Sequence, residues 1–289
     1  MLTLALVPAY IWLFLESGTP GAPYPIDLVK ARALASSLPG DKPTSVHVEH
    51  ITTIESIPAM GVMAGAGWSK TKLDVYAYQT VSPTSTVIID TGMRDDDSRA
   101  FQPEAYARVQ AALSTASLVV VTHEHFDHIG GLAAHPQLTA ILPHAILTKQ
   151  QLAHPEKMEP AKFPAKALEG FAPLDFDGAR AVAPGVVLLT APGHTPGSQL
   201  VFVQLADGRE LLFLGDVAWQ FTNIEHQRER ARLVTLMIGE DRTLVLSQLR
   251  ALAELHEKEP KLAIVPGHDA AVIEKLIAEG TLVPRFESR

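Results

Sequence analysis

Short apolar runs recur along the chain, and their lengths and spacing indicate strands. Some runs alternate hydrophobic and polar positions, as in a strand with one buried face, and others are apolar throughout, as in a strand buried on both faces. The predicted strands cover residues 45–53, 73–81, 86–92, 118–122, 186–190, 200–205, 210–214 and 262–265. The Ala206-Asp207-Gly208-Arg209 segment predicts a hairpin between the two strands that flank it.

Segments with helical character separate these strands, so the pattern predicts an α/β fold. The predicted helices cover residues 26–37, 103–114, 224–259 with a break near Gly239, and 274–279. Residues 60–67 are predicted to be a loop, and Gly130-Gly131 a close turn into a helix. Residues 136–173 are rich in Pro and Lys and lack clear periodicity, so we interpret them as an excursion over the functional site.

The N-terminal residues have a different character from the rest of the chain. Residues 2–15 carry no charge and are followed by a Pro/Gly-rich linker, residues 18–25. The apolar run is shorter than the about 20 residues that a spanning helix needs. It fits a signal-like segment or a membrane anchor, which predicts a periplasmic or membrane-anchored protein. The alternative is a first strand or docking helix in a cytoplasmic protein. We therefore divide the chain into an anchor-like segment with its linker, residues 1–25, and one domain, residues 26–289.

Composition narrows the chemistry of that domain. The chain has 289 residues, of which 47% are hydrophobic and 19% charged, and this balance is typical of a globular protein. A net charge of −8 without a Lys/Arg cluster argues against a nucleic-acid partner and leaves a small-molecule substrate. The absence of cysteine excludes disulfides, thiolate metal sites and cysteine nucleophiles. Any bound metal must therefore be held by histidine and carboxylate.

Four predicted strands are each followed by a residue type that binds metals. His123, His194, Asp216 and His268 come one to four residues after the strands at 118–122, 186–190, 210–214 and 262–265. Functional side chains gather at strand ends and in the loops that follow them. We therefore expect these four side chains to meet at one rim of the fold.

The densest chemistry is the run from His123 to His128, which holds three histidines and one aspartate in six residues. Burial of that many imidazoles and carboxylates without partners would be costly, so packing alone does not explain the run. Imidazole nitrogen and carboxylate oxygen are the ligands that zinc takes when no thiolate is present. The run therefore predicts a metal centre.

At this point the chain resembles the metallo-β-lactamase superfamily, roughly over residues 45–270. The Asp90-Thr91-Gly92 turn is also similar to the family's early strand-turn. The motifs that carry the resemblance are Thr122-His123-Glu124-His125-Phe126-Asp127-His128-Ile129-Gly130-Gly131, Pro192-Gly193-His194-Thr195-Pro196-Gly197-Ser198, Leu214-Gly215-Asp216 and Pro266-Gly267-His268.

The resemblance implies a four-layer αβ/βα sandwich of two mixed sheets flanked by helices. It also implies two zinc ions, with iron or manganese as alternatives, and a metal-bridged hydroxide that attacks the substrate. Asp127 would in addition orient this nucleophile, which gives it a catalytic role. The implied ligands are His123, His125 and His194 for the first ion, Asp127, His128 and His268 for the second, and Asp216 as the bridge.

Several nearby residues have two interpretations each. Thr122, Thr195 and Ser198 either orient the ligands or cap turns, and Asp269 either supports His268 or caps the following helix. Among the other histidines, most are interpreted as surface or substrate-loop residues. The best candidates for substrate contact, both in the excursion, are His144 and His154.

The resemblance leaves the substrate open, with hydrolysis of a lactone or other ester-like bond as the first choice. Phe126 and the Gly267-His268-Asp269 segment resemble quorum-quenching lactonases, but those enzymes carry a tyrosine where this chain has Trp219. An indole N–H can donate a hydrogen bond but cannot accept one or ionise. The alternatives are hydrolysis of a β-lactam or thioester and, in another class, a metal-binding protein without catalysis.

Overall fold

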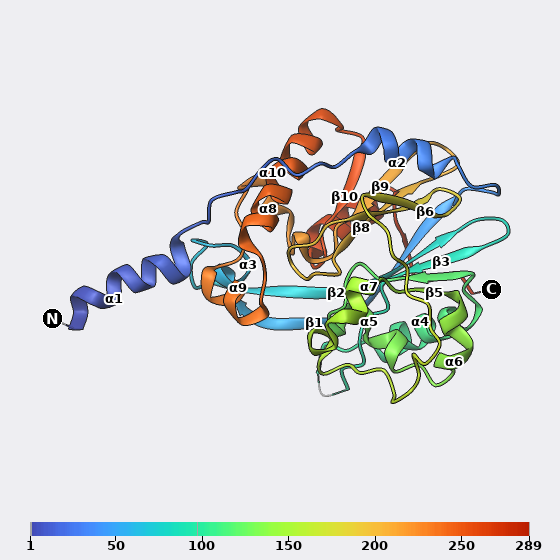
Figure 1. The fold of residues 1–289 in the computed structure, drawn as a ribbon, viewed down its shortest axis with the longest axis horizontal. Helices are drawn as coiled ribbons and strands as arrows, with labels where there is room; N and C mark the ends of the chain where they lie inside the picture. Colours follow the sequence, from blue (N-terminus) through green and yellow to red (C-terminus); the bar gives the residue numbers. More distant parts are fainter. Residues whose placement is uncertain (1, 97, 289) are drawn as a thin grey trace.

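A computed structural model describes residues 2–96 and 98–288 and contains two mixed β-sheets (Figure 1). The first sheet has the order β11-β1-β2-β3-β4-β5, in which β1, β2 and β3 are antiparallel and β3, β4 and β5 are parallel. Its strands are β1 (Ser45–Pro58), β2 (Lys70–Val81), β3 (Thr86–Ile89), β4 (Leu118–Val120), β5 (Ala145–Ile146) and β11 (Val283–Pro284).

The second sheet has the order β10-β9-β8-β7-β6. The predicted hairpin is present, because β8 and β9 pair antiparallel with Gln204 opposite Glu210. β10 pairs parallel to β9, so the ends of β7, β9 and β10 lie at the same edge. The strands are β6 (Ala179–Ala183), β7 (Val186–Thr190), β8 (Gln199–Gln204), β9 (Glu210–Phe213) and β10 (Leu262–Val265).

Alternation along the strands builds the layers. In β2, Tyr76 and Tyr78 pack between the two sheets, whereas Val75 and Ala77 face a separate core on the outside of the first sheet. Helices cover the outer face of each sheet, so the predicted four-layer αβ/βα sandwich is confirmed. The first sheet is covered by α4 (Pro103–Thr115), α5 (Phe126–Ala133) and α6 (Leu138–Ile141), and the second by α2 (Leu28–Ala35), α8 (Phe221–Glu225) and α10 (Arg242–Lys258).

The remaining helical segments are short. The break predicted near Gly239 is confirmed, since this glycine ends α9 with a left-handed φ of 68°. The helix that Gly239 ends, α9, spans Arg232–Ile238. The other segments are α3 (Ala59–Val62), α7 (Lys149–Ala153), α11 (Ala270–Ala278), and the single turns η2 (Leu142–His144), η3 (Pro155–Met158) and η4 (Gly215–Val217).

Two local predictions were wrong, and one histidine is an exception to the general interpretation of the others as surface residues. Gly130 and Gly131 lie inside α5 rather than in a turn before a helix. Glycine is needed at position 131 because α5 packs close to the chain at Thr91, and a Cβ there would stand 2.1 Å from the carbonyl oxygen of Thr91. Residues 60–67 were predicted to be a loop, but they contain most of α3. His135 is buried rather than exposed, and its Nε2 bonds the carbonyl of Gln110.

The excursion at residues 136–173 is more structured than its sequence indicated. It holds α6, η2, β5, α7 and η3. Its side chains Phe163, Leu168 and Phe171 pack against the core outside the first sheet, so apolar burial orders it. Gln151 also donates hydrogen bonds to the carbonyls of Val121 and Gly197, next to the predicted ligand loops.

The N-terminal segment forms α1 (Leu2–Tyr10) and the π-helical η1 (Ile11–Leu15), and α1 projects away from the sandwich (Figure 1). These residues are therefore helical, and the alternative prediction of a first strand was wrong. The predicted linker lies against the domain, since the backbone N–H of Gly18 donates to Glu229 and Tyr24 Oη donates to the carbonyl of Thr190. In the part of the chain that the structure describes, no helix has the length and apolarity to cross a membrane.

Candidate metal centre

The predicted ligands come together at one rim of the sandwich. His123, Asp216 and His268 each lie three residues after the last residue of β4, β9 and β10, and His194 lies four residues after β7. The seven candidates form two groups, and within each group the ligand atoms lie within 4.8 Å of one another. Side chains from four separate strand ends therefore meet, as the pattern predicted.

The run from His123 to His128 is shaped by the start of α5. His125 is the residue before the helix, with extended backbone, and Asp127 and His128 lie in its first turn. The helix approaches the turn after β3 closely because Gly131 has no side chain. There, Thr91 Oγ1 donates to the carbonyl of His128, 2.8 Å away. This contact holds the second half of the run over the first sheet.

The first group brings three imidazoles against one carboxylate oxygen. His125 Nδ1 lies 3.1 Å from His123 Nε2 and 2.9 Å from His194 Nε2. Asp216 Oδ2 lies 3.8 Å from His123 Nε2 and 3.4 Å from His194 Nε2. Four ligand atoms thus surround one point, which is the number that a tetrahedral zinc site uses.

The second group uses the other oxygen of the same carboxylate. Asp216 Oδ1 lies 3.1 Å from His128 Nε2 and 3.0 Å from His268 Nε2. Asp127 Oδ2 lies 3.7 Å and 3.5 Å from the same two nitrogens. Asp216 therefore stands between the groups with one oxygen toward each, which is the arrangement of a bridging ligand.

The donor set fits a pair of cations. His128 Nε2 and Asp216 Oδ1 lie 3.1 Å apart, yet both are buried without a hydrogen bond of acceptable geometry, although buried polar atoms are nearly always paired. The imidazole nitrogens of the first group lie 2.9–3.1 Å apart, as expected where several nitrogen lone pairs point at one cation. Histidine and carboxylate donors without thiolate suit zinc and similar divalent ions.

Contacts behind the histidines set which ring nitrogen faces the cluster. His128 Nδ1 lies 2.8 Å from Asp90 Oδ2, and His268 Nδ1 lies 2.8 Å from the carbonyl oxygen of Asp74. Because these oxygens accept, each Nδ1 carries a proton, and each Nε2 presents its lone pair when the imidazole is neutral. Thr122 Oγ1 donates to Asp90 and lies 3.2 Å from His123 Nδ1, and these contacts favour the ligand-orienting interpretation of Thr122.

Burial keeps the three imidazoles of the first group neutral. It lowers the pKa of His123 well below its usual range, helped by His128, and lowers the pKa of His125 to about 2. Burial also lowers the pKa of His194, together with the positive charge of Arg230. Neutral imidazoles offer lone pairs, so these three side chains are ready to bind a cation at neutral pH.

The second group lies in a more negative environment. Burial opposes the charged form of His128, but Asp90, Asp127 and Asp216 together raise its pKa well above the usual value. Burial likewise works against ionised Asp216, yet the facing histidines hold its pKa well below the usual value. The carboxylates therefore create a field that favours a positive charge at this position.

A buried ion pair behind His194 was not anticipated from the sequence. Arg230 is fully buried, and its guanidinium pairs with Glu240 and donates to the carbonyl of Asp216 at 2.6 Å. Both partners of the pair reach His194 Nδ1, with Glu240 Oε2 at 2.8 Å and Arg230 Nη2 at 2.9 Å, so the pair holds the ring with Nε2 toward the cluster. Both residues lie in a region predicted as helix, and nothing in the local pattern marks them as buried.

Trp219 occupies the space beside the bridge. Its Nε1 donates to Asp216 Oδ2 at 2.6 Å, and the guanidinium of Arg230 stacks over its ring at 4.5 Å. The ring stands edge-on to His194 and His268, with centroids 6.4 and 6.1 Å apart. The indole is thus held among the ligands.

Other candidates lie outside the two groups. Thr195 and Ser198 bond each other within a turn, which supports the capping interpretation, and Thr195 also donates to buried Glu124. Asp269 caps α11 by accepting from Val272 and does not bond His268. His144 is exposed, and the Nδ1 of His154 lies 3.2 Å from Glu156. The structure brings neither histidine into the cluster.

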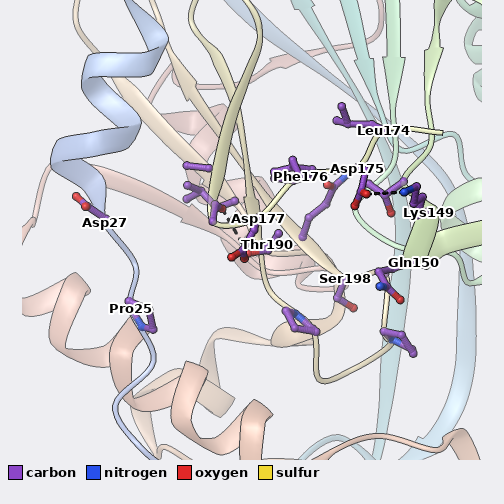
Figure 2. A pocket seen from close by; sticks show the side chains of 18 of the residues that line it. Pro25, Asp27, Lys149, Gln150, Leu174, Asp175, Phe176, Asp177, Thr190 and Ser198 are labelled. Carbon is purple, nitrogen blue, oxygen red and sulfur yellow. Dashed lines mark hydrogen bonds and ion pairs between the residues drawn. The ribbon is translucent and has the colours of Figure 1, made fainter. Parts of the chain in front are cut away.

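A cavity of about 780 Å³ lies next to the turn that carries His194, and none of the seven ligand candidates lines it (Figure 2). The linker residue Pro25, the α7 residues Lys149 and Gln150, and Ser198 line it. Lys149 and Asp175 form an exposed ion pair at its edge. Its walls thus combine the linker, the excursion and a ligand loop.

Comparison with curated proteins gives partial matches to metallohydrolases. The chain is 32% identical over 154 residues to N-acyl homoserine lactonase AiiA of Bacillus thuringiensis subsp. kurstaki, which covers 52% of this chain and 55% of that protein. It is 34% identical over 176 residues to the probable metallo-hydrolase Rv2300c of Mycobacterium tuberculosis, covering 52% and 54%. The chain spans about half the length of the curated relatives it matches.

Solved structures share the fold at low sequence identity. An N-acyl homoserine lactone hydrolase, solved with N-hexanoyl-L-homoserine at its catalytic metal centre, matches with a TM-score of 0.63 and 20% identity, over 81% of this chain and 96% of that one. The dizinc quorum-quenching lactonase AidC matches with a TM-score of 0.56 and 15% identity, over 79% and 89%.

The family follows from a broader match. A profile of the metallo-beta-lactamase superfamily matches residues 72–268, which is more than half of the chain and includes all seven ligand candidates. The order of strands, the helical outer layers and the two ligand groups agree with that match. The chain therefore belongs to the metallo-beta-lactamase superfamily.

Proposed function

We propose that this protein is a dinuclear metal-dependent hydrolase that opens the ring ester of a small lactone, with N-acyl homoserine lactones as the substrate class. The observation that carries the two-metal proposal is Asp216, whose two oxygens face two separate groups of ligands. The lactone is supported by those curated relatives that are N-acyl homoserine lactonases, AiiA among them. Two observations support ester hydrolysis as the reaction: the chain matches about half the length of these lactonases, and it belongs to the metallo-beta-lactamase superfamily.

We propose zinc as the metal at both positions. His123, His125, His194 and Asp216 would hold one ion, and Asp127, His128, His268 and Asp216 the other. Two such ions polarise a carbonyl, lower the pKa of a shared water and stabilise the departing oxygen. The absence of cysteine and the neutral imidazoles of the first group support this assignment.

The chain's own residues would position the substrate at the more open side of the centre. His125 and Phe126 are partly exposed, whereas His123, Asp127 and His128 are buried. A substrate can therefore reach the centre over Phe126, whose ring offers an apolar contact. Asp127, a member of the second group, is the carboxylate proposed to orient the attacking water.

Trp219 departs from the tyrosine of the lactonases that this chain resembles. Its N–H is directed to Asp216 Oδ2, so we propose that it orients the bridging carboxylate rather than the carbonyl of the substrate. An indole cannot supply a proton at neutral pH. The leaving oxygen would therefore take its proton from solvent water, or from Asp127 after that carboxylate has accepted the proton released by the attacking water.

The test is metal analysis of the purified chain followed by turnover of four substrates: an acyl-homoserine lactone, nitrocefin, S-lactoylglutathione and bis-nitrophenyl phosphate. We expect two metal ions per chain and turnover of the lactone. Turnover of nitrocefin or the thioester alone would replace the substrate class. Bound metal without turnover of any substrate would indicate a non-catalytic metal-binding protein, and one ion per active chain would refute the two-metal proposal.

Asp216→Ala tests the bridge directly. Removal of both carboxylate oxygens takes one ligand from each group, so we expect loss of paired metal and of turnover. Asp207→Ala is the matched control, because Asp207 is an exposed aspartate in the β8–β9 turn. Full activity of Asp216→Ala would show that the bridge is assigned to the wrong residue.

A further inference from the structure

Exposed apolar side chains gather at one end of the molecule. Ten large hydrophobic side chains are exposed in the described part of the chain, and seven of them lie on α1, η1, the loop after α3, and α9. We call this set the N-terminal apolar surface. It consists of Leu6, Val7, Ile11, Trp12, Trp68, Leu236 and Met237.

The folded domain holds the base of the N-terminal helix firmly. Three arginines donate to carbonyl groups at its carboxyl end: Arg228 to Leu15 at 2.9 Å, Arg232 to Trp12 at 3.2 Å, and Arg242 to Glu16 at 2.8 Å. These carbonyls have no partner within the helix, so the arginines replace bonds that the helix end lacks. The helix therefore leaves the domain in a defined direction, which Figure 1 shows.

Aromatic rings surround the point where the helix leaves. Tyr10, Phe14 and Trp68 pack together with centroids 5.3 to 6.4 Å apart, and Trp68 Nε1 donates to Tyr10 Oη. The guanidinium of Arg232 stacks over Trp12 at 4.5 Å. Tryptophan, tyrosine and arginine are the side chains that occupy the boundary between lipid tails and headgroups.

We propose that the N-terminal apolar surface docks on a lipid bilayer, with α1 and η1 inserted into one leaflet without crossing it. No residue from Leu2 to Leu15 is charged, so the helix has no polar face to turn toward water. A groove on a protein covers one face of a helix, whereas lipid covers all of them. Its nine and five residues extend about 21 Å, less than the about 30 Å of a hydrocarbon core.

Charge at the base of the helix favours lipid as well. Arg228 and Arg232 form no ion pair with any carboxylate of the described residues, and both are partly exposed. Arg232 stacks on Trp12, and Arg228 bonds the carbonyl of Leu15 at the base of the helix, where a docked surface would meet lipid phosphates. Anionic lipid should therefore bind more strongly than zwitterionic lipid.

The test is flotation of the full chain with vesicles of phosphatidylcholine, alone or mixed with phosphatidylglycerol. Val7→Glu places a charge on the helix at a side chain that is 60% exposed, so folding should not suffer. Val29→Glu is the matched control, because Val29 is 78% exposed on α2, away from the helix. We expect the wild-type chain and Val29→Glu to float, and more strongly with phosphatidylglycerol. Val7→Glu should lower the vesicle-bound to free ratio about tenfold or more.

Met237→Glu tests the part of the surface on the folded body, where the side chain is 77% exposed. We expect a several-fold loss of binding, smaller than that of Val7→Glu. Unchanged binding would refute contact of α9 with lipid.

The proposal as a whole is overturned by three results: no flotation of the wild-type chain, equal flotation of Val7→Glu, or equal losses in Val7→Glu and Val29→Glu. A wild-type dimer in light scattering that Val7→Glu converts to a monomer, without vesicle binding, would assign the surface to a second copy of the chain. Lactone turnover is measured separately, so failure of this proposal and failure of the proposed function are distinguishable.

Discussion

Replacement of Asp90 by asparagine should weaken the second metal position without disturbing the backbone. Asp90 lies in the turn after β3 with a left-handed φ of 57°, a conformation that asparagine also adopts readily. The two side chains have nearly the same shape. Asp90→Asn therefore changes the charge and the hydrogen bonds but leaves the turn unstrained.

The structure shows why the amide cannot replace the carboxylate. Asp90 Oδ1 accepts from the backbone N–H of Thr122 at 2.6 Å, and Oδ2 accepts from Thr122 Oγ1 at 2.9 Å and His128 Nδ1 at 2.8 Å. An asparagine has one oxygen, so its NH2 group must face one of these sets. If it faces His128, the imidazole proton moves to Nε2, the atom 3.1 Å from Asp216 Oδ1. If it faces Thr122, a buried N–H loses its acceptor.

Both outcomes lower the affinity for metal at the second position. Loss of an orienting partner behind a metal-binding histidine typically costs about 10- to 100-fold in affinity, or about 1.4–2.8 kcal/mol. An unsatisfied buried group would in addition lower the free energy of unfolding by about 1–3 kcal/mol. We expect Asp90→Asn to retain the first ion, release the second at lower chelator concentration, and unfold at lower temperature.

The assay is metal content per chain after dialysis against graded chelator, together with thermal unfolding of the same samples. Asp175→Asn is the control, because that carboxylate forms an exposed ion pair with Lys149 outside the cluster. If Asp90→Asn kept two ions with the chelator midpoint of the wild-type chain, the carboxylate would not be what holds the proton on His128 Nδ1.

Three further substitutions test other parts of the centre. Gly131→Ala should lower the free energy of unfolding by about 1–3 kcal/mol in chemical denaturation, because the new Cβ meets the carbonyl of Thr91 at 2.1 Å; wild-type stability would contradict the close approach. Glu240→Gln leaves buried Arg230 without its anion, so thermal unfolding should show a loss of up to about 3–5 kcal/mol, and a neutral result would mean the pair is not needed. Trp219→Phe removes the N–H group that donates a hydrogen bond to the bridging carboxylate, so chelator titration should show weaker metal retention with unchanged stoichiometry. Loss of both ions would instead show that the bridge requires the indole.

Local pattern was sufficient for most of the fold. Period-two alternation separates the two faces of β2, and short apolar runs located β4, β7, β9 and β10. These signals are readable because each depends on the nearest neighbours in the chain and on burial of a strand face. The same runs placed metal-binding residue types at four strand ends, and the family resemblance completed the set of seven ligand candidates.

The roles of those seven residues as ligands stay a prediction, but their convergence is a finding of the tertiary structure. No local pattern shows that the two oxygens of Asp216 face different groups, because His194 and His268 come from other strands. Sheet order brings those strand ends to one rim. The resemblance to a family supplied the pairing of ligands, and the coordinates agree with it.

Only the tertiary structure decided which residues support the ligands and where the N-terminal helix goes. Glu240 and Arg230 lie in a segment whose pattern is that of helices at a surface, yet both are buried behind His194. Gly131 was interpreted as a turn former. Its role in the close packing of α5 was missed because Thr91, the residue it contacts, lies 40 residues earlier in the sequence, and local propensity does not report such contacts. Local spacing determines which face a side chain takes, whereas burial and pairing depend on what the folded chain brings to that face.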